Sequence, residues 1–290
     1  MGRALISGES AAIRVAAPEA GLEDMEIRLL LEGIRLCYGY DFREYALRPL
    51  RRGIADAMMA EGVSTVSAYQ DRILHDASCM RRFLGAVGVS VTSMFREAEL
   101  MRCMREEVIP IFRTYPSVRI WMVGCATGEE VYSLAITLEE EGVLRRASIY
   151  ATDLNEDTLA VARTGAYPLD RIRSYEDAYV SSGGRGRLSD HYDVFGRSAR
   201  FHRNLQSNVT WARHNLVTDA SFNQFHLIIC ANVMIYFRAS LQERAHRLFF
   251  DSLVRSGFLA LGKGESLVFS PEISRYQQFR HGVSLFRKIR

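Results

Sequence analysis

Residues 120–135 read IWMVGCATGEEVYSLA, and the order of residue types in this stretch decides the fold class. An apolar run at residues 120–123 is followed by a loop of small residues from Gly124 to Gly128, and helical periodicity begins at Val131. A strand, a glycine-containing loop and a helix in this order are typical of the start of a nucleotide-binding α/β fold. Two glycines could equally close an ordinary turn, so the loop alone leaves both interpretations open.

A carboxylate on the next predicted strand favours the binding interpretation. Residues 149–151 form a second apolar strand that ends at Asp153, about one strand-and-helix unit beyond the loop. An acid at this position can accept hydrogen bonds from both hydroxyls of a ribose. We therefore predict that Asp153 binds a ribose, although the same side chain could instead cap a helix.

The start of the helix argues against a dinucleotide ligand. No third glycine follows the loop, and Glu129 and Glu130 stand at the helix start instead. Carboxylates there repel a pyrophosphate but suit an ammonium and a sulfonium group, while the helix amides can still receive a ligand carboxylate. S-adenosylmethionine has this charge pattern and is the predicted cofactor. Glu129 is predicted to contact its amino group or a loop amide.

Several longer motifs resemble the CheR family of chemoreceptor glutamate methyltransferases. They are GCATGEEVYSLA at 124–135, YATDLNEDTLAVARTGAYP at 150–168, HNLVTD at 214–219 and NVMIYF at 232–237. The resemblance extends from about Glu26 to the C-terminus. It implies an α/β fold of the class I S-adenosylmethionine-dependent methyltransferases, with a Rossmann-like seven-stranded sheet, a small N-terminal all-helical domain and an inserted small β subdomain.

Periodicity and composition divide the chain. Residues 1–24 lack a periodic apolar stripe and are predicted to be a disordered leader. Residues 25–88 form the predicted N-terminal helical domain, and residues 89–290 the methyltransferase domain. An inserted subdomain is predicted at about 170–208, where regular alternation stops over a length too great for a plain loop. Its glycines fit either a tight turn or a disordered tip; they are Gly183, Gly184 and Gly186.

The predicted sheet ends in an antiparallel hairpin, and its seventh strand is ambiguous. The other strands are expected at about 119–124, 148–153, 209–213, 225–231, 257–262 and 283–289.

The resemblance also implies site residues. Arg96, in the segment SVTSMFR at 90–96, is predicted to hold a carboxylate of the substrate or the cofactor. Its planar guanidinium can bind either carboxylate in a fixed orientation. Tyr236 lies beneath the reacting centre, although it could equally be a core aromatic. Arg96 and Tyr236 are the predicted catalytic residues. The predicted cofactor-binding residues are Ser90, Thr92, Arg96, Gly124, Glu129, Asp153, Asn215, Leu216 and Asn232, with Asn215 and Leu216 on the adenine side.

Two positions depart from the family pattern. Ser90 stands where the family usually has asparagine, and Ala231 where it usually has the arginine of Cys-Arg-Asn-Val. The missing arginine leaves a cationic position empty. A catalytically impaired, S-adenosylmethionine-binding regulatory or scaffold protein of the same family is therefore the alternative interpretation.

The predicted activity is S-adenosylmethionine-dependent formation of glutamate γ-methyl esters on chemoreceptors or receptor-like signalling proteins. A glutamate, with a pKa near 4.3, is already ionised at neutral pH, so no general base is needed and none is expected. Nucleic acid is not the predicted partner, because the formal net charge is only +3 and no base-flipping Asp/Asn-Pro-Pro-Tyr motif is present.

Basic residues near the N-terminus suggest a contact with the receptor. Arginines 43, 48, 51 and 52 fall within ten residues and can share a helix face, which could also be simply solvated. The resemblance favours docking of this face on the receptor's methylation helices. In some family members the inserted subdomain also grips a peptide at the receptor's C-terminus.

Cysteine and histidine spacing predicts the compartment and the absence of a metal. The five cysteines show no paired spacing, and no apolar run approaches the roughly 20 residues that cross a bilayer. We therefore expect a cytoplasmic protein without direct membrane insertion. The seven histidines lack metal-ligand spacing, so no metal site is expected.

Overall fold

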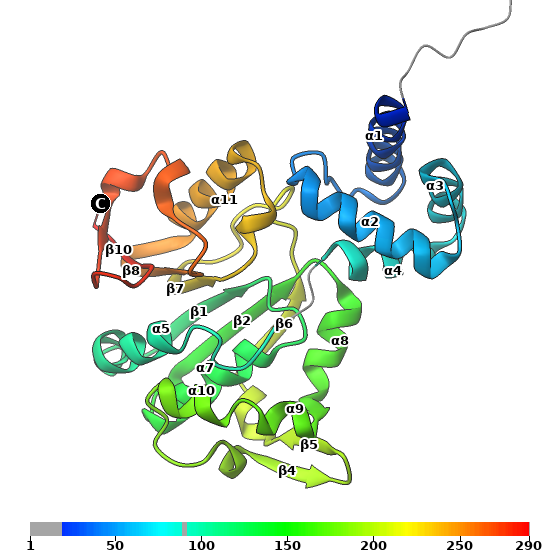
Figure 1. Cartoon of the computed structure of the whole chain (residues 1–290). Coiled ribbons are helices and arrows are strands. Elements are labelled where there is room, and N and C mark those ends of the chain that lie inside the picture. The colour runs from blue at the N-terminus through cyan, green and yellow to red at the C-terminus, as the bar shows by residue number, and fades with distance from the viewer. Residues whose placement is uncertain (1–18, 89–91, 290) are drawn as a thin grey trace, which may run out of the picture.

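The computed structural model describes residues 19–88 and 92–289 (Figure 1). The N-terminal domain consists of α1 (Glu19–Tyr38), α2 (Leu47–Glu61), α3 (Val66–His75) and α4 (Ala77–Val87). Thr65 and Asp76 cap α3 and α4, because each side chain accepts a hydrogen bond from a first-turn amide. Helix α1 begins before Met25, so the predicted leader at 1–24 includes the first helical turns. Residues 1–18 and Ser90 lie outside the described residues.

Seven strands form one sheet in the order β6-β2-β1-β7-β8-β10-β9. The strands from β6 to β8 pair in parallel, and β10 is antiparallel to both β8 and β9. The predicted seven-stranded α/β fold is confirmed, and β9 is the strand that the sequence left ambiguous. The bounds are β1 (Val118–Val123), β2 (Ala147–Asp153), β6 (Val209–Arg213), β7 (Phe225–Cys230), β8 (Leu253–Leu261), β9 (Tyr276–Gln278) and β10 (Leu285–Lys288).

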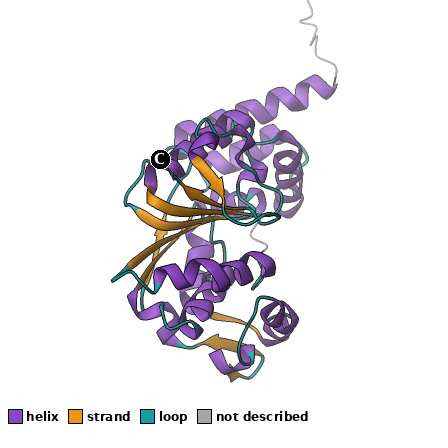
Figure 2. Cartoon of the chain, turned by 90° about the vertical axis from the view of Figure 1, so that its left-hand side faces the viewer, coloured by secondary structure: helices purple, strands orange, loops and turns teal. Residues whose placement is uncertain are grey.

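Helices cover both faces of the sheet (Figure 2). Successive residues of β1 point to opposite faces, so Ile120 and Met122 join one core and Trp121 and Val123 the other. Helices α5 and α7 contribute to the first core and α11 to the second. The bounds are α5 (Ala98–Cys103), a π-helical turn (Met104–Val108), α6 (Ile109–Phe112), α7 (Glu129–Glu140), α8 (Glu156–Thr164) and α11 (Ala239–Ser252).

The inserted segment forms a separate small sheet. Its strands are β3 (Ala166–Pro168), β4 (Tyr192–Phe195) and β5 (Ser198–Phe201), in the antiparallel order β3-β5-β4, with α9 (Leu169–Arg173) and α10 (Glu176–Ser181) between β3 and β4. The first strand therefore starts before the predicted boundary at 170. The glycine run is a packed turn, because a Cβ on Gly184 would lie 2.4 Å from the buried ring of Tyr179.

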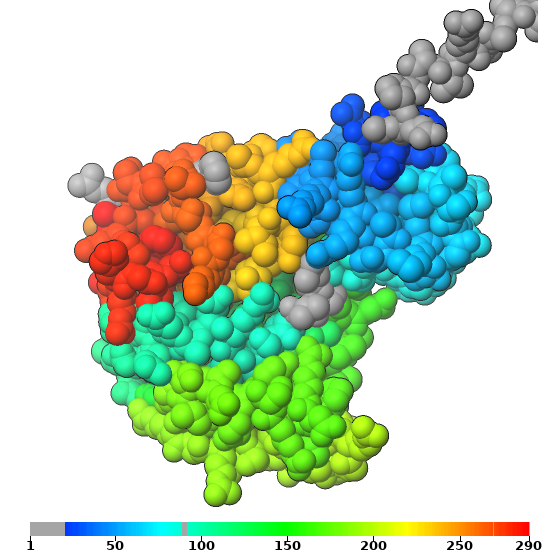
Figure 3. Space-filling model, in the orientation of Figure 1, coloured from blue at the N-terminus to red at the C-terminus, as the bar shows by residue number. Residues whose placement is uncertain are grey.

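The helical domain contacts the sheet domain through a short β-bridge. Tyr45 and Phe237 pair antiparallel, and their rings meet edge to face at 5.0 Å. Next to them the Arg238 amide donates to the Glu44 carbonyl at 2.9 Å. In Figures 1 and 3 the helical domain, in blue, therefore lies against the part of the sheet domain that carries α11. No helix within the described ranges is both long and apolar enough to span a bilayer.

Candidate active site

A continuous cleft opens at the carboxyl ends of β1, β2, β6 and β7. It consists of a larger cavity of about 880 Å³ and a smaller one of about 430 Å³. The two share the loop after β1 and the start of the loop after β7, so they form a single site. Their common lining residues are Val123, Gly124, Ala126 and Asn232.

The loop after β1 leaves room for a ligand only because its residues are small and its backbone is unusual. Gly124 has a φ of +63°, and a Cβ there would lie 2.3 Å from a methyl group of Val233. Ala126 also has a positive φ, of 46°, which is strained for a residue with a side chain. The Cys125 amide donates to the Thr152 carbonyl at 2.9 Å and ties the loop to β2.

Asp153 lies at the end of β2 and lines the larger cavity. Its carboxylate accepts hydrogen bonds from the Ala126 amide at 2.8 Å and the Asn155 amide at 2.9 Å. Burial raises the pKa of Asp153, and these amides oppose that rise. The carboxylate therefore shapes the glycine loop and faces the cavity at the position predicted for a ribose ligand.

Glu265 shapes the opposite side of the cleft, and no motif in the sequence pointed to it. This buried carboxylate accepts hydrogen bonds from four amides at 2.7–3.1 Å, and burial raises its pKa. The contact holds Asn232 in a left-handed conformation, with a φ of 61°. The donors are the amides of Asn232, Val233, Met234 and Gly262.

The smaller cavity brings charged residues together. Thr92, Arg96, Glu130 and Ala231 all line it. Burial raises the pKa of Glu130 to about 7, and the Arg96 guanidinium opposes this rise. Burial also raises the pKa of Tyr236, which lines the adjoining larger cavity, and Arg96 again opposes the shift. Arg96 thus acts on Glu130 in its own cavity and on Tyr236 in the adjoining one.

The structure does not bring Glu129 to the cleft. Its side chain is fully buried, lines neither cavity, and accepts a hydrogen bond from the Thr127 hydroxyl at 2.6 Å. Arg171 lies 2.8 Å from its other carboxylate oxygen. Glu130, one residue further along α7, lines the smaller cavity instead.

The remaining predicted residues line the larger cavity. Asn215 and Leu216 follow β6, and the Asn215 side-chain oxygen accepts a hydrogen bond from the Val217 amide at 2.9 Å. The helical domain supplies an apolar wall that the sequence did not predict, because its residues lie far from the motifs along the chain. This wall consists of Phe42, Tyr45, Leu84 and Val87.

Comparison with known families accounts for nearly the whole chain. Residues 25–87 match the CheR methyltransferase all-alpha domain, and residues 90–283 match the CheR methyltransferase SAM binding domain. The chain belongs to the CheR methyltransferase family.

Named CheR relatives cover most of the chain. "Putative methyltransferase Cher3" of Pseudomonas putida is 43% identical over 91% of this chain and 97% of its own length. The "Chemotaxis protein methyltransferase" of Listeria monocytogenes is 27% identical over 79% of this chain and 86% of its own. The protein of the same name from Salmonella typhimurium is 24% identical over 92% of each chain.

The cleft of this CheR chain fits S-adenosyl-L-methionine, the cofactor of the matched domain. In the larger cavity, the apolar wall would pack against the base of this cofactor and the Asp153 carboxylate would accept hydrogen bonds from its ribose. The smaller cavity offers Glu130, whose ionised form attracts a ligand with ammonium and sulfonium charges. Gly124 lines both cavities, and a side chain there would collide with Val233, which lines the larger one.

Proposed function

We propose that this chain is a protein-glutamate O-methyltransferase that forms γ-methyl esters on a chemoreceptor or a receptor-like signalling protein. The observation that carries the proposal is the joined cleft, in which the cofactor cavity opens onto a second cavity lined by Arg96 and Glu130. Relatives named as chemotaxis protein methyltransferases support the choice of substrate. We also propose that the reaction takes place in the cytoplasm.

The residues of the smaller cavity have a positioning role in this reaction. When bound, the cofactor supplies a methyl group to a carboxylate oxygen by in-line displacement, and the bonding electron pair leaves with the sulfur. The substrate carboxylate is already ionised, so no protein group has to accept a proton. Arg96 orients a carboxylate, and such positioning contributes roughly 7–11 kcal/mol to lowering a barrier.

The basic face of α2 supports docking of an acidic helix. Arg48 and Arg52 are exposed, and Arg52 is close enough to Tyr236 to act on its pKa. Arg43 and Arg51 instead form ion pairs within the helical domain, with Asp41 and Asp24 among others. We propose that Arg48 and Arg52 lead a glutamate-bearing helix to the mouth of the cleft.

The inserted sheet offers a second docking surface. β4 is an edge strand of the sheet, and its Val194 and Phe195 side chains are 52% and 59% exposed. An exposed strand edge can pair with an extended peptide. We propose that a receptor peptide binds there.

A regulatory or scaffold protein that binds the cofactor but is catalytically impaired is the second candidate function. The reason is that Ala231 lines the smaller cavity at a position where the family usually has arginine. Incubation of the protein with methyl-labelled cofactor and receptor fragments from its own organism distinguishes the two candidates. We expect alkali-labile methanol release from the parent protein, and its loss in Arg96→Ala while S-adenosylhomocysteine affinity stays within about tenfold. No methyl ester from the parent, but ester formation by Ala231→Arg, would make the natural protein a binding or regulatory relative.

A further inference from the structure

Arg171 of α9 reaches from the inserted subdomain to Thr92, which lines the cleft, and to the buried Glu129 at the start of α7. The same guanidinium nitrogen, Nη2, lies 2.7 Å from the Thr92 carbonyl oxygen and 2.8 Å from Oε1 of Glu129. Its Nε donates to the Tyr175 hydroxyl at 2.9 Å, which fixes the guanidinium plane within the insert. Thr92 lines the cleft, and Glu129 starts the helix that follows the glycine loop.

The Glu129 carboxylate is buried, so its contact with Arg171 is important for its charge state. It is fully buried, and burial raises its pKa, which the Arg171 cation opposes. A buried carboxylate needs an opposite charge or full hydrogen bonding to remain ionised. The nitrogen that donates to the Thr92 carbonyl also forms the ion pair with Glu129, so Arg171 links the backbone at Thr92 to the start of α7.

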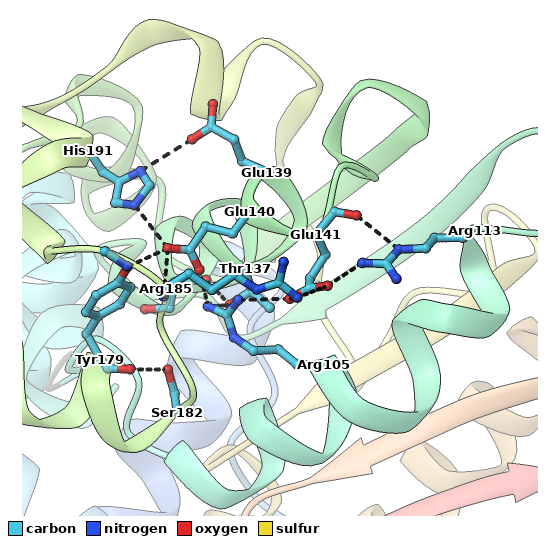
Figure 4. A network of polar contacts seen from close by, with 12 residues as sticks. Arg105, Arg113, Thr137, Glu139, Glu140, Glu141, Tyr179, Ser182, Arg185 and His191 are labelled. Carbon is cyan, nitrogen blue, oxygen red and sulfur yellow. Dashed lines mark hydrogen bonds and ion pairs between the residues drawn. The ribbon is translucent and has the colours of Figure 1, made fainter.

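The insert holds α7 at other points as well. Near the glycine loop, the Tyr167 hydroxyl of β3 donates to the Thr127 carbonyl at 2.6 Å. At the far end of α7, the Tyr179 hydroxyl donates to Glu140, and His191 lies 3.4 Å from the same carboxylate (Figure 4). Contacts at both ends of α7 make the helix, the loop before it and the insert one connected unit.

We propose that Arg171 is a positioning residue through which the inserted subdomain sets the separation between the Thr92–Arg96 segment and the glycine loop. The inference rests on the proposed function only in the role given to Arg96. In this arrangement Arg171 touches neither cofactor nor substrate. It acts by placing Thr92 and, four residues later, Arg96 relative to the cofactor-binding loop.

A purely structural salt bridge would have different consequences. If Arg171 only neutralised Glu129, removing both charges together would restore the site. If Arg171 positions Thr92, removing both charges would restore stability but leave the cleft misaligned. The double variant Glu129→Gln/Arg171→Gln therefore separates the two roles.

The experiment compares the parent chain, Arg171→Gln, the double variant and Arg173→Gln, an exposed arginine of the same helix, as a control. Thermal midpoints and calorimetric titration with S-adenosylhomocysteine are measured for each. We expect Arg171→Gln to lower the midpoint and weaken binding roughly tenfold, since small misplacements in a site have effects of this size or larger. The double variant should recover the midpoint but not the affinity, and Arg173→Gln should match the parent in both.

Methylation of a receptor fragment supplies a further readout. At saturating cofactor, both Arg171 variants should show a lower kcat, with the KM for the fragment within about threefold of the parent. Binding of S-adenosylhomocysteine within threefold of the parent by the double variant would overturn the positioning role. The binding measurement needs no methyl acceptor, so it decides this inference even if the proposed substrate is wrong. Should Arg171→Gln not fold, the double variant decides alone, because it contains no unpaired buried carboxylate.

Discussion

At the scale of single residues, two carboxylates that accept backbone hydrogen bonds define the cleft. Asp153 accepts a hydrogen bond from the Ala126 amide of the glycine loop, and Glu265 accepts hydrogen bonds from three amides after β7 and from the Gly262 amide after β8. A charged acceptor suits several converging amide donors better than a neutral side chain does. The positions of Ala126 and Asn232, both with positive φ, depend on these contacts.

Replacement of Asp153 tests its predicted role toward the ribose. Asp153→Ala should weaken S-adenosylhomocysteine binding by roughly 1–3 kcal/mol, the usual effect of losing hydrogen bonds to a charged group. The thermal midpoint should fall as well, because the Ala126 and Asn155 amides lose their acceptor. Asp153→Asn keeps one acceptor oxygen and should retain more stability. An unchanged dissociation constant in a folded alanine variant would remove Asp153 from the binding site.

Replacement of Glu265 should damage the site from a distance. Glu265→Gln replaces one carboxylate oxygen with an NH₂ group, so two of the four amide donors lose their acceptor, at a cost of about 1–3 kcal/mol or more. We expect a lower thermal midpoint and weaker cofactor binding, since Asn232 lines both cavities. Glu272→Gln, which changes a carboxylate that accepts no hydrogen bond from the loop after β7, is the control. Parental stability and binding in Glu265→Gln would contradict this account.

The pH dependence of binding tests Glu130. Its pKa is raised to about 7, so its ionised fraction increases as the pH rises through 7. The ionised form attracts the ligand ammonium, so S-adenosylhomocysteine affinity should increase by up to about tenfold from pH 6 to pH 8. In Glu130→Gln the affinity for S-adenosylhomocysteine should change less between pH 6 and pH 8, and it should be lower than that of the parent at pH 8. A flat profile in the parent protein would show that Glu130 does not titrate against the ligand.

At the scale of elements, α7 contributes to the cofactor cleft, whereas the inserted sheet is the proposed docking surface. Helix α7 follows the glycine loop and contains Glu130 and the buried Glu129, whereas β4 is an edge strand of the inserted sheet. The segment from Tyr179 to the glycine turn cannot be removed to test docking alone, because Tyr179 is fully buried and its ring contacts Phe95. Substitutions of exposed side chains at the end of β4 avoid this core.

The edge strand can be tested without disturbing the cofactor site. Val194→Ser/Phe195→Ser should leave S-adenosylhomocysteine binding unchanged, because neither residue lines the cleft. Losing two exposed apolar contacts should raise the KM for a receptor fragment that carries the docking peptide about tenfold. Val180→Ser, an equally exposed position on α10, is the matched control. Methylation of that fragment at the parental KM would rule out docking on β4.

At the scale of the whole molecule, the cleft belongs to two domains. The helical domain contributes four apolar lining residues and contacts the sheet domain at the bridge between Tyr45 and Phe237. The cofactor site is therefore complete only when the two domains are packed together.

Tyr45→Ala tests this dependence. Losing a half-buried aromatic ring from the junction should lower the free energy of unfolding by about 2 kcal/mol and weaken S-adenosylhomocysteine binding. Tyr45→Phe keeps the ring and should behave as the parent does. Unfolding followed by circular dichroism, with calorimetry for binding, provides both measurements. Parental binding in Tyr45→Ala would mean that the helical domain is not a functional wall of the cleft.

The sequence by itself determined the fold class and the family, and most of the residues that it singled out for the site line the cleft. Strand, loop and helix signals are local, and parallel strands bring their carboxyl ends to one edge, so Gly124, Asp153 and Asn232 were predictable together. Thr92, Arg96, Asn215, Leu216 and Tyr236 also line the cleft, as the motifs predicted.

Only the tertiary structure decided which neighbouring or distant residues complete the site. Successive helix residues differ by about 100° in direction, so only one of Glu129 and Glu130 can face the cleft. The packing of α7 on the sheet, rather than the motif, determines that Glu130 is the one that lines it. Glu265 lies more than 30 residues from the loop that it holds, and Arg171 belongs to an inserted subdomain. Contacts of this kind depend on how elements pack, and spacing along the chain carries no information about that packing.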